Sequence, residues 1–142
     1  FTLLHTIAHL LIRELALDCG YNAASIRERV YADIEGGEAQ AGVLIYTAAA
    51  DSDGTLGGLV DIGKPSNLGR LLTQAIDRAK TCASDPLCSE HSPPTDSSLH
   101  AASCHACSFV SETSCEIGNR YLDRALVIPT LQVRDGAFFK GI

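Results

Sequence analysis

The order of apolar and polar residues at the start of the chain predicts a helix from Phe1 to Cys19. Its leucine and isoleucine residues recur at helical spacing and cover more than half of the helix circumference. Gly20 follows in the position where a left-handed residue often ends a helix. A helix that is apolar on most sides is packed on most sides, so we expect it to be central.

Strands are expected after this helix. Residues 25–34 alternate between apolar and polar positions and predict a strand, although Ser25 and Glu28 also match a capping box, which is typical of a short helix. Residues 42–49 (GVLIYTAA) are a short β-rich run and predict a buried strand. After a turn, residues 55–62 predict a second short strand or extended segment, weakened by two glycines.

Two further helices are predicted, over residues 68–81 and 113–126. The first follows Pro65 and has apolar residues at clean helical spacing. The second opens with Thr113 and Glu116, which match a capping box.

Composition describes one globular domain. The chain has 142 residues, 46% hydrophobic and 20% charged, which is enough to bury one core and too apolar for disorder. Its net charge of −6 makes it a poor nonspecific binder of nucleic acid, because such binding depends on Lys and Arg.

The apolar opening carries charged residues and lacks a basic leader, so we expect no membrane span, no secretory signal and a cytoplasmic location. The chain contains no Met, so we expect it to be a piece of a longer protein.

Residues 82–113 change character: they hold Ser, Pro, His and four cysteines with little periodicity. A loop of this length inside a compact domain needs an organiser. Cys82-x5-Cys88, then 15 residues, then Cys104-x2-Cys107 has the two-pair layout of structural zinc sites. Two thiolates three positions apart on a tight turn can both reach one ion at about 2.3 Å, so these four cysteines are the predicted zinc ligands.

Other ligands and other chemistry stay open at this point. Cys115 is the alternative to Cys82 as fourth ligand, and His91, His100 and His105 are further rivals. Disulfides are disfavoured because no secretory feature is present, and free buried thiols leave the loop unexplained. Cys19 is most simply a small core residue.

A set of four thiolates favours a structural over a catalytic zinc, because no coordination position stays open. Such a site carries a formal charge of about −2 by valence counting. We expect Arg120 and Arg124, on the predicted last helix, to screen it.

His5 and His9 lie one helical turn apart, a spacing at which two imidazoles can hold one metal. We favour a simpler interpretation, two polar residues hydrogen-bonded to neighbouring elements. If a second site exists, Asp51 and Asp53 are its expected partners, and the chain would be a metal-dependent hydrolase or nuclease-like module. The stretch Asp51-x-Asp53-Gly54 is not a calcium loop, because its sixth and twelfth positions are Leu and Ile.

The predicted elements combine into an α+β domain. A central apolar helix and flanking helices pack on a small mixed sheet that contains residues 42–62. A four-cysteine zinc knot within residues 82–115 lies between the last two helices, and residues 129–142 form a C-terminal strand and tail.

Four stretches carry a resemblance to a known family: LLHTIAHLLIRELALDCGY, GVLIYTAAADSDGTLGGLV, CASDPLC and CHACSFVSETSCEIGNRYLDRALVI. The chain resembles the C-terminal zinc-binding domain of MrfA-type helicases over residues 1–128, and within that family the branch found in the bacterial DISARM anti-phage system. The resemblance implies a structural zinc held by Cys82, Cys88, Cys104 and Cys107. In the helicase branch the first cysteine pair is closer together than here.

The resemblance also implies a role. It suggests a non-catalytic accessory domain of a larger anti-phage protein, which supports a DrmA-like partner helicase and, through the complex, its handling of DNA. No Walker motif (GxxxxGK[ST]) occurs in these residues, so we do not expect ATP hydrolysis here.

Overall fold

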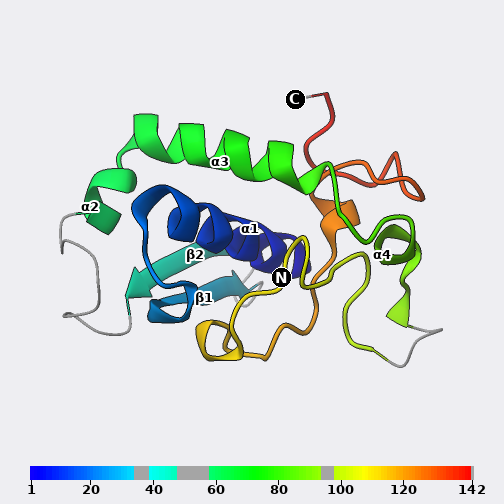
Figure 1. Ribbon diagram of the computed structural model, residues 1–142, viewed down its shortest axis with the longest axis horizontal. Helices are drawn as coiled ribbons and strands as arrows, with labels where there is room; N and C mark the ends of the chain where they lie inside the picture. The colour runs from blue at the N-terminus through cyan, green and yellow to red at the C-terminus, as the bar shows by residue number, and fades with distance from the viewer. Residues whose placement is uncertain (34–38, 48–57, 94–97, 142) are drawn as a thin grey trace.

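The computed structural model of this chain describes residues 1–33, 39–47, 58–93 and 98–141. Helix α1 (Thr2–Cys19) lies in the middle, with helix α3 (Pro65–Ala79) on one side and a hairpin of β1 (Ile26–Asp33) and β2 (Gln40–Thr47) on the other (Figure 1). These elements form three layers in an α+β arrangement. Among the described residues, no helix has both the length and the apolar character that crossing a bilayer requires.

Helix α1 is central because it carries apolar side chains on two opposite faces. Leu10 packs with the inner face of α3, whereas Ile12 and Leu15 pack with Ile26 of the hairpin. Gly20 ends the helix in the left-handed conformation (φ 68°), which glycine adopts without steric cost. The predicted helix, its end and its central position are confirmed.

The hairpin has one covered face. Its strands are antiparallel, not mixed, and Glu28 stands opposite Ile45 in the register. Along β1 buried Ile26 and Glu28 alternate with exposed arginines, as the period-two pattern predicted. Strand β2 is not buried as expected, because the outer face of the pair is open and leaves Leu44 47% exposed.

The segment before α3 corrects a prediction. Residues 58–62, expected as part of a strand, form the short helix α2 (Gly58–Ile62). Leu59 and Ile62 are three residues apart and pack against the same apolar cluster, which is helical and not extended spacing. The predicted helix 68–81 is confirmed as α3, which begins at Pro65.

The C-terminal part has few regular elements. Over its described residues they are α4 (Leu87–Glu90), η3 (Glu112–Ser114) and η4 (Arg124–Leu126). A further 3-10 turn, η1 (Ala23–Ser25), lies between α1 and the hairpin. The α-helix predicted from Thr113 to Leu126 is wrong, because Gly118, Asn119 and Tyr121 all have positive φ and break any helix there. The strand predicted within 130–142 is also wrong over the described residues 130–141, which form bends.

Candidate metal centre

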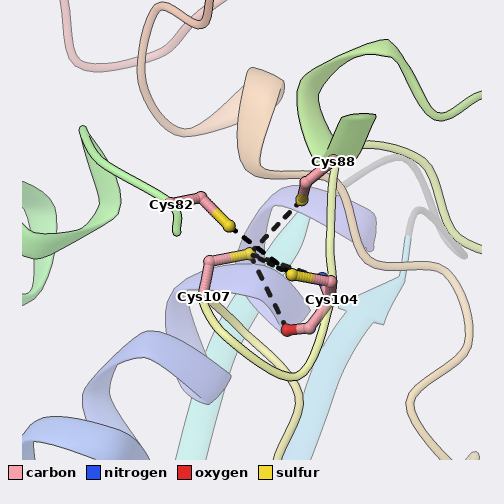
Figure 2. A group of neighbouring side chains, drawn as sticks. All are labelled: Cys82, Cys88, Cys104 and Cys107. Atoms are coloured by element: carbon pink, nitrogen blue, oxygen red, sulfur yellow. Dashed lines mark hydrogen bonds between the residues drawn. The ribbon is translucent and has the colours of Figure 1, made fainter. Parts of the chain in front are cut away.

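Four cysteines come together at the junction between α3 and the C-terminal part of the chain. Cys82 follows α3, Cys88 lies on α4, and Cys104 and Cys107 lie on the turn that precedes η3. Their Sγ atoms all lie within 4.8 Å of one another. Figure 2 shows the four sulfurs pointing toward a common centre.

Two local turns bring each pair into position. In the first, the backbone N–H of Asp85 donates to the Cys82 carbonyl at 3.0 Å, and α4 then starts at Leu87. In the second, the backbone N–H groups of Cys107 and Ser108 donate to the Cys104 carbonyl at 3.2 and 3.0 Å. Both turns are local, which is why the spacing of the cysteines could predict them.

The sulfur geometry fits a metal and not a disulfide. The Sγ–Sγ distances are 3.5 Å for Cys82–Cys104, 3.7 Å for Cys88–Cys107 and 3.8 Å for Cys104–Cys107. A tetrahedral zinc with bonds of about 2.3 Å would hold its sulfurs about 3.8 Å apart, whereas a disulfide brings them to about 2.05 Å. All six cysteines of the chain are free, so the disulfide interpretation does not hold.

The surroundings differ from one thiol to the next. Burial raises the pKa of the Cys88 thiol, and the neighbouring Cys107 raises it further. Burial alone would also raise the pKa of Cys104, but backbone N–H groups of Ala106 and Cys107 outweigh it and lower that pKa to about 7. Four thiolates this close repel one another, so a divalent cation is the counter-charge that suits this donor set.

Of the two arginines expected near the cysteines, the structure brings one close. Arg124 is fully buried and donates to Asp85 at 2.6 Å and to the Ala79 carbonyl at 3.0 Å. Burial alone would lower the pKa of Arg124, but Asp85 and the neighbouring Cys107 raise it. Arg120 is exposed.

Arg13 of α1 holds the second cysteine turn, a role that the sequence did not reveal. Its guanidinium donates to the carbonyls of Ala106 (2.9 Å), Phe109 (2.9 Å) and His105 (3.2 Å). These are three acceptors on the turn that carries Cys104 and Cys107. The only signal in the sequence was that Arg13 is one of the few polar residues of the predicted, mostly apolar helix.

The rival ligands lie elsewhere. His91 contacts Ser98 at 2.6 Å and stacks on His100, and His105 packs edge-on against Phe109. Cys19 is partly buried beside the apolar core.

Cys115 belongs to a second cluster, with His5, His9 and Glu28. All four residues of this cluster are buried. The sequence pointed to the two histidines but not to Glu28. The one feature that could have revealed Glu28 is its place on the inward side of β1, where buried and exposed residues alternate. Asp51 and Asp53, the partners expected for the histidines, lie outside the described residues.

Comparisons with known proteins agree with this geometry. A family model, the MrfA Zn-binding domain, matches residues 7–108. The DISARM protein DrmB of Bacillus paralicheniformis is 45% identical over 142 residues, which is 100% of this chain and 25% of that relative. The chain thus spans about a quarter of the length of the curated relative that it matches.

Proposed function

Because the chain belongs to the MrfA Zn-binding domain family, we propose that Cys82, Cys88, Cys104 and Cys107 hold one structural zinc ion. The observation that carries this proposal is the convergence of their four sulfurs at spacings close to those of a tetrahedral zinc site. All four cysteines fall within the residues that the family model matches, and Cys115 does not.

The zinc serves architecture and not catalysis. Four thiolates fill a tetrahedral ion and leave no position for water or substrate. Over the described residues 82–93 and 98–107, the segment that they organise is mostly turns and bends around the four-residue α4, so it has little regular structure of its own there. Zinc binding therefore contributes directly to the folding free energy of this segment.

The wider role follows from the relative. We propose that this domain is a non-catalytic accessory part of a DISARM DrmB-like anti-phage protein. The 45% identity extends over every residue of the chain, which supports a shared role. The domain would support a DrmA-like partner helicase, and DNA would be reached through that complex, since the net charge of −6 disfavours DNA binding by this domain alone.

The hydrolase alternative has weaker support. His5 and His9 are both 0% exposed, so a substrate has no access to their rings. A hydrolytic metal needs an open coordination position that water and substrate can reach.

Metal analysis of cysteine variants tests the zinc site. We expect Cys104→Ser and Cys107→Ser each to lower the zinc content by one ion per chain and to expose the segment 82–109 to protease. Cys19→Ser is the matched control, because Cys19 is a free cysteine outside both clusters, and it should keep the wild-type zinc content. Full zinc content in both cluster variants would contradict the proposed ligands.

Co-purification tests the wider role. The DrmB-like protein that contains this domain is expressed with its helicase partner, as wild type and as Cys104→Ser/Cys107→Ser. Wild type should retain the helicase and the double variant should lose most of it. A double variant that is still folded elsewhere and binds the helicase as wild type does would refute the supporting role.

A further inference from the structure

The second cluster brings together four metal-binding side chains from three distant parts of the chain. His5 and His9 come from α1, Glu28 from β1, and Cys115 follows η3. Nε2 of His5 lies 3.3 Å from the Cys115 sulfur and 2.7 Å from the Glu28 carboxylate, and Nε2 of His9 lies 3.3 Å from the same carboxylate. The four ligand atoms lie within 4.8 Å of one another.

Each imidazole is held by its other nitrogen. Nδ1 of His5 lies 3.3 Å from the Tyr121 carbonyl, and Nδ1 of His9 lies 3.0 Å from the Ser108 carbonyl. A carbonyl oxygen only accepts, so each Nδ1 carries the proton and donates it. Both Nε2 atoms are therefore directed into the cluster. Metal-ligating histidines are held in the same way, with the other ring nitrogen donating to a carbonyl or a carboxylate.

With neutral imidazoles, the centre of the cluster holds acceptors alone. Two imidazole nitrogens, a carboxylate and a sulfur are all lone-pair groups once the Nδ1 atoms hold the protons. One carboxylate oxygen of Glu28, Oε2, is buried and has no hydrogen-bond partner in the described part of the chain. A cation at the centre would satisfy this set of acceptors.

Charge balance favours a divalent ion. Two neutral imidazoles, one carboxylate and one thiolate carry −2, which a divalent cation neutralises. This matters because the cluster is buried, where an unbalanced charge is costly. The four-cysteine cluster is different, since it keeps a formal charge of about −2 with a zinc ion by the same counting.

The sulfur of Cys115 is oriented by the backbone that follows it. The backbone N–H of Asn119 donates to this sulfur at 3.3 Å.

We propose that His5, His9, Glu28 and Cys115 form a second structural site for a divalent cation of the zinc class, independent of the four-cysteine site. Tetrahedral ligands at zinc distances would lie about 3.3–3.6 Å apart. The His5–Cys115 and His9–Glu28 distances are already 3.3 Å. The His5–Glu28 distance of 2.7 Å has to increase by about half an ångström to admit the ion.

The site would tie the start of α1 to the segment that follows η3. It joins the first turns of α1 to a segment more than a hundred residues later, and both to the inner face of the hairpin. His9 also contacts the carbonyl of Ser108, the residue next to Cys107. The two sites are therefore neighbours, each helping to place the same turn.

Metal counting by native mass spectrometry tests the proposal with zinc as the only added metal. We expect two zinc ions per wild-type chain and one in Glu28→Gln, which keeps the shape of the side chain and removes its charge. Glu14→Gln is the matched control: Glu14 is also buried, but it pairs with Arg78 outside both clusters, so two ions should remain. A folded Glu28→Gln chain with as many zinc ions as wild type overturns the second site.

A measurement on the unmodified protein covers the case in which the variant fails to fold. Crystals of the zinc-loaded wild type should show an anomalous peak at the zinc edge between His5 and Cys115. A peak at the four cysteines with none at His5 would overturn the second site and leave the first intact. The reverse pattern would retain the second site and refute the first.

Discussion

Residues 1–79 and residues 80–141 are built by different means. The first part has two long helices and a hairpin that bury leucine and isoleucine side chains in layers (Figure 1). The second part has one α-helix of four residues and two short 3-10 turns over its described length. Its backbone groups therefore find partners mainly in turns, side chains and the first part.

The contacts between the parts show how the second one is held. Arg13 donates to the cysteine turn, Thr6 accepts from the backbone N–H of Asp123 at 3.0 Å, and Arg124 donates to the carbonyl of Ala79. Each is a directed polar contact across the boundary. The first part is held by broad apolar packing together with ion pairs between α1 and α3, whereas the described residues of the second part add only Val127 and Ile128 to the buried members of these apolar clusters. The second part should therefore depend more on single groups and on metal.

The largest effect is expected when the metal is removed, because the two parts should then respond differently. Treatment with a chelator should strip zinc from the four cysteines, because the thiolates at the loop surface are partly exposed at Cys82 and Cys104. Amide protons in 82–109 should then lose protection against hydrogen exchange, while those in the middle of α3 lose least. Hydrogen-exchange mass spectrometry reads both segments in one experiment.

Equal loss of hydrogen-exchange protection in residues 82–109 and in α3 would contradict this prediction. It would mean that the two parts unfold as one cooperative unit, and that the difference in construction has no energetic counterpart. The matched control is the zinc-loaded protein carried through the same buffers.

The second-largest effect is expected from a core substitution in the first part. Leu71 lies on α3 and is fully buried in the apolar cluster that includes Ile12 and Leu15 of α1. Leu71→Ala should therefore lower the free energy of unfolding by about 2–5 kcal/mol. Because its apolar cluster includes none of the four cysteine ligands, the zinc content should stay at the wild-type value. Denaturant titration measures the first quantity and metal analysis the second.

Leu17→Ala is the control, since Leu17 lies in α1 but is 65% exposed and should have little effect. Loss of zinc in Leu71→Ala would show that the metal site depends on the apolar layers after all.

How far the sequence predicts each part follows from the range of the contacts. The spacing of apolar residues predicted α1 and α3, because each helix is shaped by its own periodic face. The same holds for the inward side of β1. The two cysteine pairs were visible because the residues of each pair are close in the chain.

The rest could not be predicted because it depends on distant partners. Cys115 meets His5 across 110 residues, and no local pattern records that contact. The capping box at Thr113 predicted a helix, but three residues with positive φ from Gly118 to Tyr121 turn the chain back on itself. Only tertiary contacts reveal which local signal prevails.

A smaller effect is expected at the boundary. Arg13→Ala should lower the free energy of unfolding by about 2 kcal/mol, since it removes charged hydrogen bonds to three carbonyls of the cysteine turn. It should also speed zinc release to a chelator, which a stopped-flow indicator assay can follow. Arg27→Ala is the control, because Arg27 lies on the open face of the hairpin. Equal release rates in the two variants would show that the turn does not need α1.

The smallest effect is expected inside the second part, at Asn119. Its side chain makes two hydrogen bonds of 3.0 Å with the backbone of Val110, and its backbone has φ 59°. Both Asn119→Ala and Asn119→Gly remove these bonds, but only Gly adopts positive φ freely. We expect a loss of about 1 kcal/mol for Gly and somewhat more for Ala, measured by denaturant titration of the zinc-loaded protein. Equal losses would mean that the left-handed backbone carries no cost here, and that this turn is held by its side-chain bonds alone.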